Sequence, residues 1–250
     1  MTQNSDFHTQ QFLAHISLDC VVFGFHDSQL KVLLIRRKHT REWALPGGFV
    51  KEDESIEVAA TRVLQERTGL DDIFLKQFNI FSDPGRARRP PRVEEILDPG
   101  PIFDQKWFEQ RFISVGFYAL VDFSKAEPTP DFLSDLCEWK ALDEVDALIL
   151  DHNQIINKAL ETLRLQLNYQ PLGYKLLPDK FTMPELQKLY ETIIGKELDR
   201  RNFQRKIVSY GILNKLEERK TGGAHKAPFL YEFNLENYQK ALRTGLNGGW

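Results

Sequence analysis

Cysteine and long apolar runs are scarce in this chain of 250 residues. Its two cysteines, Cys20 and Cys137, are far apart and match no metal-binding spacing, so we interpret them as reduced thiols rather than as a disulfide. No apolar run approaches the roughly 18 residues needed to cross a bilayer. Residues 1–12 are polar and lack the apolar core of a secretion signal. These absences favour a cytoplasmic protein.

The charge is divided unevenly along the chain, although the net charge is only −3. Residues 1–150 hold 17 Lys/Arg and 25 Asp/Glu, whereas residues 151–250 hold 16 Lys/Arg and 11 Asp/Glu. The basic excess is concentrated in residues 196–226, with nine basic and four acidic side chains. Such an excess favours a partner rich in phosphate, although a solvated surface without a partner gives the same count.

Residues 1–150 alternate between strand and helix patterns. Residues 20–25 and 31–35 are rich in β-branched and aromatic side chains, and a turn is expected between them. Residues 55–67 are predicted as a helix that ends at Gly69, and residues 112–121 as a further strand. A second helix is expected to begin near Asp151, which suits an N-cap. This order predicts an α/β layout on a mixed sheet.

Residues 82–106 interrupt this pattern with five prolines, which exclude regular structure. A long loop of this kind in a compact domain is usually either functional or disordered, and both alternatives stay open. Its first half carries four arginines, namely Arg86, Arg88, Arg89 and Arg92.

The last hundred residues have the order helix, turn, basic helix and hairpin. Thr182 to Glu185 have the spacing of a capping box, and a helix is predicted over 183–194. After the connection 195–198, a basic helix over 199–209 is predicted, with Asp199 as N-cap. Strands are expected at Leu216–Arg219 and Phe229–Phe233, on either side of a tip rich in Gly and Lys at 220–226. This is the order of a winged helix-turn-helix domain.

The second of these helices carries side chains that suit the reading of DNA bases. In the helix-turn-helix mode it lies in the major groove, where Arg recognises guanine and Asn recognises adenine. Cations on the hairpin suit phosphate contacts. A winged helix used for protein contacts is the alternative. The candidate DNA-binding residues are Arg200, Arg201, Asn202, Gln204, Arg205, Lys206, Lys220, Thr221, His225 and Lys226.

Residues 48–70, GFVKEDESIEVAATRVLQERTGL, resemble the Nudix box. That pattern fixes a glycine, a glutamate, an Arg-Glu pair, a Glu-Glu pair and a closing glycine at set spacings, and the preceding Trp43–Gly47 segment is also family-like. The resemblance implies a Nudix fold, whose active members cleave a diphosphate linked to another group. The matching positions are Gly48, Glu54, Arg62, Leu64, Glu66, Gly69 and Leu70.

Two positions depart from that pattern on the face that would hold the metal. Positions 63, 66 and 67 share a helix face, and the resemblance implies glutamate at each for binding Mg²⁺ or Mn²⁺. This chain has Val63, Glu66 and Arg67. At an effective dielectric of about 20, unit charges 4 Å apart interact by about 4 kcal/mol, and a divalent ion would be repelled about twice as strongly. We therefore expect no metal, no other cofactor and no hydrolase activity.

Arg67 has two interpretations at this stage. In the first, the helix has only a structural role, and Arg62 pairs with Glu66 four residues later in the chain. In the second, Arg67 replaces the metal and binds a phosphate or other polar ligand. A ligand pocket is expected nearby. The candidate effector-binding residues are Arg37, Phe49, Glu66, Arg67, Phe81, Asp83 and Arg86.

An altered Nudix box followed by a winged helix resembles the Nudix-related transcriptional regulators of the NrtR and AraR type. The resemblance spans nearly the whole chain and is carried by LDCVVFGF, WALPGGFVKEDES, RVLQERTGL, FTMPELQKLYE and LDRRNFQRKI. It implies an α+β protein: a Nudix-fold α/β/α sandwich over 1–150 that senses an effector, and a winged helix over 151–250 that binds DNA.

The resemblance also implies a cytoplasmic homodimer that acts on an operator, with ADP-ribose or a pentose such as arabinose as effector. The rival enzyme interpretation is a Nudix hydrolase that acts on ADP-ribose or a related compound through Glu52, Asp53, Glu54 and Glu66. A third interpretation is a sensor that recruits protein instead of DNA.

Overall fold

The computed structural model describes residues 11–38, 40–71, 73–86, 110–131, 133–220 and 227–246. Its contacts divide into two compact units. One comprises 1–22, 32–119 and 126–159, and the other comprises 23–31, 120–125 and 160–250. The boundary between residues 150 and 151 stays a prediction. Among the described residues, no helix combines the length and hydrophobicity needed to cross a membrane.

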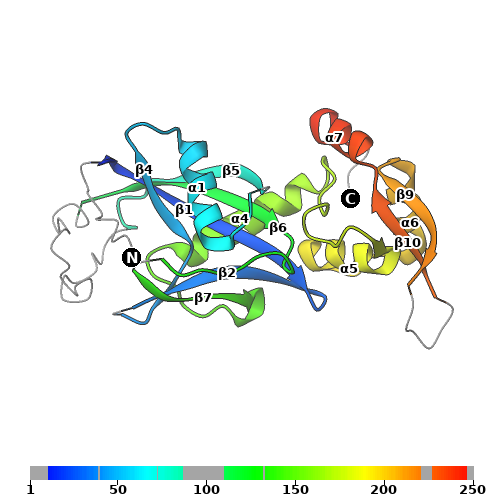
Figure 1. Cartoon of the computed structure of the whole chain (residues 1–250), viewed down its shortest axis with the longest axis horizontal. Coiled ribbons are helices and arrows are strands. Elements are labelled where there is room, and N and C mark those ends of the chain that lie inside the picture. The colour runs from blue at the N-terminus through cyan, green and yellow to red at the C-terminus, as the bar shows by residue number, and fades with distance from the viewer. Residues whose placement is uncertain are drawn as a thin grey trace, which may run out of the picture. The chain divides into compact units, whose positions relative to one another are not determined.

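A seven-stranded sheet is the frame of the Nudix-like part (Figure 1). Its strands have the order β3-β2-β1-β6-β5, with β4 paired to β1 and β7 paired to β2. The two-residue turn at Asp27 and Ser28, both with positive φ, joins β1 to β2 as a tight hairpin. The strands are β1 (Phe12–His26), β2 (Gln29–Arg37), β3 (Trp43–Ala44), β4 (Gly47–Lys51), β5 (Phe74–Phe81), β6 (Ile113–Val121) and β7 (Ser134–Ala141).

Helices pack on this sheet and bury continuous strand segments. Residues 18–24 of β1 are buried without alternation, as expected for a strand covered on both faces. Helix α1 (Ile56–Thr68) starts at the N-cap Ser55 and ends at Gly69, whose φ of 68° suits glycine. After the short 3₁₀ turn η2 (Leu142–Glu144), α4 (His152–Gln166) buries an apolar face. The predicted α+β architecture is confirmed.

The winged helix has three helices and a three-stranded antiparallel sheet of order β8-β10-β9. Its core is aromatic: the ring of Phe233 lies 4.9 Å from Phe181 and 5.2 Å from Tyr238 between centroids. Its elements are β8 (Phe181–Thr182), α5 (Met183–Ile194), α6 (Arg200–Ser209), β9 (Leu213–Arg219), β10 (Phe229–Phe233) and α7 (Leu235–Thr244).

Three sequence-based expectations differ from the structure in detail. Strand β9 begins at Leu213, three residues before the predicted Leu216, because its first residues pair with the end of β10. The sequence interpretation omitted α7 and β8. The helix expected to begin near Asp151 begins at His152, and the Asp151 carbonyl accepts the N–H groups of Gln154 and Ile155. The Asp151 carboxylate accepts hydrogen bonds from Arg86, which the sequence did not predict. The predicted proline-rich loop falls mostly on residues 87–109, outside the described residues.

Candidate functional site

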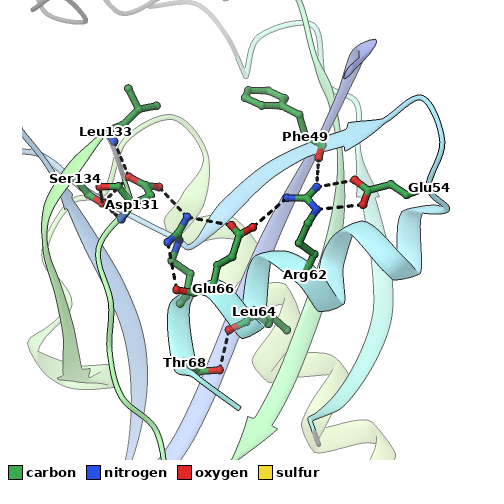
Figure 2. A network of polar contacts seen from close by, with 10 residues as sticks. Phe49, Glu54, Arg62, Leu64, Glu66, Thr68, Asp131, Leu133 and Ser134 are labelled. Atoms are coloured by element: carbon green, nitrogen blue, oxygen red, sulfur yellow. Dashed lines mark hydrogen bonds and ion pairs between the residues drawn. The ribbon is translucent and has the colours of Figure 1, made fainter. Parts of the chain in front are cut away.

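The Nudix-box helix carries a row of alternating charges (Figure 2). The row runs through Glu54, Arg62, Glu66, Arg67 and Asp131, each paired with the next. It lies along α1, which packs against β4, and ends at the loop before β7. We call these five residues the charge row. Because acids and bases alternate, each carboxylate already has a cationic neighbour.

The first pair of the charge row holds β4 to α1. Arg62 donates to both carboxylate oxygens of Glu54, at 3.1 and 2.6 Å, and to the Phe49 carbonyl at 3.0 Å. The backbone N–H of Lys51 also donates to Glu54, at 2.8 Å. The Arg62 hydrogen bonds hold the pKa of Glu54 below its ordinary value, although burial opposes this. Glu54 is therefore a carboxylate anion that Arg62 and the Lys51 N–H hold in place.

The other end of the charge row is more loosely paired. Arg62 lies 3.6 Å from Glu66, which confirms the pairing predicted for these two residues. Arg67 lies 3.5 Å from Glu66 and 3.7 Å from Asp131. These separations exceed the 2.7–2.9 Å typical of a charge-assisted hydrogen bond. Arg67 is thus attracted by two carboxylates without a close contact to either.

The residues at this position do not fit a divalent cation. Of the three positions on the expected metal-binding face, only Glu66 offers oxygen ligands, and it lies between two arginines. The side chain of Val63 is buried and packs against Gly48, where an added Cβ would come within 2.8 Å of it. Within the described residues, no cluster of His, Cys, Asp and Glu is arranged to hold a metal.

A second buried network surrounds Arg86, which was predicted to line the effector pocket. Its guanidinium donates to Asp151 twice, at 3.0 Å each, and to Asp19 at 3.1 Å. The Arg86 side chain is only 5% exposed. Asp19 also accepts from Ser114 and lies 3.4 Å from His152. Through this network, Arg86, which follows β5 in the chain, is connected to β1, β6 and the start of α4.

His152 links the Arg86 network to the segment that precedes β4. Its Nδ1 accepts the backbone N–H of Leu45 at 2.9 Å, so its Nε2 carries the proton that faces Asp19. Burial lowers the pKa of His152 below its ordinary value, against the opposing effect of Asp19 and Asp151. The imidazole is therefore neutral and structural. No local spacing in the sequence signals a network between residues so far apart.

The predicted effector residues fall into separate groups. Arg37 is half-buried, and burial lowers its pKa although the charges of Asp131 and Glu42 act in the opposite direction. Asp83 closes a turn by accepting the N–H of Gly85. No hydrogen bond or ion pair in the described part of the chain joins Arg86 to Glu66 or Arg67.

The two remaining predicted effector residues take part in aromatic contacts. Phe49 packs beside Phe112, with 5.5 Å between ring centroids, and Phe81 packs beside Phe78, at 5.8 Å. The charge of Asp131 therefore acts on both Arg37 and Arg67, and the aromatic contacts place Phe49 and Phe81 in different ring pairs.

In the winged helix, α5 side chains fix the turn that leads to α6. Gly195 ends α5 with a φ of 79°, which favours glycine. Glu191 accepts the N–H of Leu198 at 3.0 Å, and Gln187 donates to the Leu198 carbonyl at 2.8 Å. Asp199 then caps α6 by accepting the N–H of Asn202 at 2.8 Å. Local hydrogen bonds thus fix the direction in which α6 begins, a role of Gln187 and Glu191 that the sequence reasoning missed.

Helix α6 presents its polar side chains to solvent and buries Phe203 and Ile207. Arg205 donates to the Oδ1 of Asn202 at 2.9 Å, which orients that amide. Among the described residues, no acidic side chain forms an ion pair with Arg200 or Arg201. The exposed polar residues of this face are Arg200, Arg201, Asn202, Gln204 and Arg205; we call them the α6 face.

The remaining predicted DNA contacts are placed less uniformly. Lys206 is half-buried, and its pKa is lowered by that burial. Lys220 pairs with Glu185, a member of the α5 capping box. Thr221, His225 and Lys226 lie outside the described residues.

Comparisons with known proteins identify a Nudix domain followed by a winged helix domain. A family model of the NUDIX domain matches residues 14–163, and one of the NrtR DNA-binding winged helix domain matches residues 173–233. The chain belongs to the family of Nudix-related, NrtR-type regulators. The "ADPR responsive transcriptional repressor NtrR" of Acinetobacter baylyi is 32% identical to it over 230 residues, which cover 89% of this chain and 83% of that relative.

Solved structures of this regulator family cover the same length. Crystal structures of NrtR from Shewanella oneidensis, alone and complexed with a 27mer DNA, align with TM-scores of 0.73 and 0.75. Their sequence identities are 27% and 25%. The alignments cover 94% of this chain and 100% and 99% of the solved chains, respectively. The predicted Nudix fold with a C-terminal winged helix is therefore confirmed.

Proposed function

We propose that this chain is a DNA-binding transcriptional regulator, in function a repressor, whose Nudix domain binds ADP-ribose without hydrolysing it. The observation that carries the proposal is the α6 face, which leaves cations and an amide exposed on the helix that would enter the major groove. The relative from A. baylyi, described as a repressor that responds to ADPR, supports both the activity and the effector.

The α6 face suits direct reading of bases. Arg200, Arg201 and Arg205 can donate in pairs to guanine, and Asn202 can bond adenine through its oxygen and its NH₂ group. The Arg205 hydrogen bond leaves a second lone pair and both N–H groups of Asn202 for a base. Phosphate contacts complete the interface. We assign these contacts to Lys206, Lys220, Thr221, His225 and Lys226, and assign Gln204 to the groove.

The effector site is proposed to include the residues that the sequence suggested. Of these, Arg67 has the strongest support, because it is buried beside Asp131 without a close ion pair. Arg37 is half-buried, and the charge of Asp131 also acts on it, so it adds positive charge for an anionic ligand. Arg86 contributes through its carboxylate partners rather than by a free guanidinium. The proposed set is Arg37, Phe49, Glu66, Arg67, Phe81, Asp83 and Arg86. A pentose is the alternative effector and offers no charge for these arginines.

The absence of hydrolysis is proposed from the chemistry of the charge row. Diphosphate cleavage in this fold needs a divalent metal that neutralises the phosphates and activates water. Only one carboxylate remains on that face, between two arginines. The rival hydrolase would act through Glu52, Asp53, Glu54 and Glu66, and of these Glu54 is already bound by Arg62 and by the Lys51 N–H. We further propose that the regulator acts as a homodimer in the cytoplasm, since operators commonly have two-fold symmetry.

A selection experiment tests DNA binding without knowledge of the operator. The purified chain is incubated with a random library of double-stranded DNA, and bound fragments are recovered over several rounds. We expect one motif to be enriched and the affinity for it to fall steeply as salt rises, because bound phosphates release counterions. Failure to enrich any motif, with the protein folded, would contradict the proposal.

A further inference from the structure

Arg67 has far fewer hydrogen bonds than a buried guanidinium requires. Its side chain is only 10% exposed, and it has five N–H donors. Among the described residues, its guanidinium forms one hydrogen bond, 3.4 Å long, to the carbonyl of its own helix neighbour Glu66. Its Nε is buried and has no hydrogen-bond partner in the same part of the chain. A buried donor without a partner has lost its hydration with nothing in return, so it needs an explanation.

Asp131 is held where it cannot close on Arg67. One of its oxygens accepts the N–H of Leu133 at 2.9 Å and the hydroxyl of Ser134 at 2.6 Å. Its other oxygen stops 3.7 Å from Arg67 (Figure 2). The loop before β7 therefore fixes this carboxylate as a neighbour that attracts Arg67 and leaves its donors open. Asp131 is itself only 10% exposed, so solvent does not explain the separation.

A purely structural role for Arg67 accounts for only part of this arrangement. Arg67 lies in the last turn of α1, where a cation interacts favourably with the helix dipole. That effect also stabilises an exposed cation, and it requires neither burial nor an unpaired Nε. An anion that completes the guanidinium would account for both features.

We propose that Arg67 replaces the catalytic metal of the Nudix fold as the group that binds the effector's diphosphate, so that effector binding needs no divalent cation. This inference rests on the proposed function, since it names what that same site recognises. A guanidinium fork donates two parallel hydrogen bonds to phosphate oxygens, whereas it offers no activated water for cleavage. Arg37, which is half-buried and on which the charge of Asp131 also acts, adds positive charge for the same anion.

Calorimetric titration with ADP-ribose tests this assignment. The full chain is titrated in EDTA and again in Mg²⁺, and we expect equal affinities. In EDTA, inorganic pyrophosphate should compete with ADP-ribose, whereas adenosine and ribose should compete poorly. A requirement for Mg²⁺, or a failure of pyrophosphate to compete, would overturn the assignment. Both measurements use the unmodified protein, so they stand even if a variant is unstable.

A matched pair of variants locates the anion. Arg67→Gln should weaken ADP-ribose binding about 10- to 100-fold, the effect expected from losing hydrogen bonds between charged groups. Arg41→Gln removes an exposed arginine that pairs with Asp135 and should leave the affinity unchanged. Arg67→Lys keeps the charge without the fork and should lie between them. Full affinity in Arg67→Gln would refute the assignment.

The DNA-binding readout separates this inference from the proposed function. Without ADP-ribose, Arg67→Gln should bind the selected DNA motif as the parent does, since Arg67 lies on the Nudix helix. If the parent binds DNA but not ADP-ribose, the diphosphate inference fails while DNA binding stands. If ADP-ribose binds through Arg67 but no DNA motif is enriched, the inference holds and the proposed regulator function fails.

Discussion

Helices α1 and α6 both carry arginines, but they place them in opposite environments. On α1, Arg62 and Arg67 have side chains 25% and 10% exposed, and each lies between two carboxylates. On α6, Arg200 and Arg201 are exposed. Buried charges interact strongly and set local structure, whereas exposed charges are screened and remain available to partners. The comparison indicates that α1 holds its arginines within the fold, beside carboxylates, whereas α6 leaves its arginines available to an external partner rich in phosphate.

The largest effect should come from removing a buried cation. Arg86→Met leaves Asp19 and Asp151 buried without their partner, and breaking such a pair costs about 3–5 kcal/mol. We expect the free energy of unfolding, measured by urea titration, to fall by that amount. Arg41→Met, at an exposed pair, should lose less than about 1 kcal/mol. Equal losses in the two variants would mean that burial does not set the cost.

The next effect should appear in DNA binding rather than in stability. Arg201→Ala should weaken binding to the selected motif by about 1–3 kcal/mol, if this side chain reads a base. Arg243→Ala, an exposed position on α7, removes the same charge from the same domain and serves as the control. Fluorescence anisotropy with labelled DNA measures both. If both variants lose the same affinity, Arg201 contributes to DNA binding only through its positive charge and not by reading a base.

A pH series sharpens the contrast between buried and exposed groups. Because burial lowers the pKa of His152 below 6.5, the unfolded chain binds a proton near that pH while the folded chain does not. Stability from this group is complete above about pH 6.5 and is lost as pH falls, by at most about 1.4 kcal/mol per pH unit. The melting temperature should decline between pH 7 and pH 5.5, and less steeply in His152→Gln. Parallel declines would exclude His152 as the cause.

The smallest effect concerns the N-terminal cap of α5, the helix that precedes α6. Thr182→Ala removes the hydroxyl that accepts the Glu185 N–H, and should cost about 1 kcal/mol of stability. The control Thr61→Ala removes a hydroxyl that bonds only within α1, and should change stability by less than about 0.5 kcal/mol. Thermal melts measure both. A Thr182→Ala loss no greater than the control would show that this cap contributes little.

Features set by nearby residues were predictable from the sequence. The bounds of α5 were exact, because the capping box at Thr182 and the glycine at 195 define both of its ends locally. The Nudix helix was placed within one residue for the same reason, through Ser55 and Gly69. The pairing of Arg62 with Glu66 followed from helical spacing alone.

Features that depend on the tertiary fold were not predictable. The partner of Arg67, Asp131, lies 64 positions later in the chain, and the partners of Arg86 lie 65 and 67 positions away. A single sequence contains no local spacing that links such residues. The sequence suggested separate roles for Arg86, as a ligand-binding cation, and for Asp151, as a helix cap, and it did not show that the two bind each other.

The central claim is that a metal-independent Nudix domain senses a nucleotide and controls a DNA-binding helix. One measurement tests it directly: anisotropy of the selected DNA motif with and without ADP-ribose in EDTA, then repeated in Mg²⁺, with chromatography of the ADP-ribose afterwards. We expect ADP-ribose to change the DNA affinity at least about tenfold in both buffers and to be recovered intact. Unchanged DNA affinity, with ADP-ribose converted to AMP and ribose 5-phosphate at about 1 s⁻¹ in Mg²⁺, would contradict it.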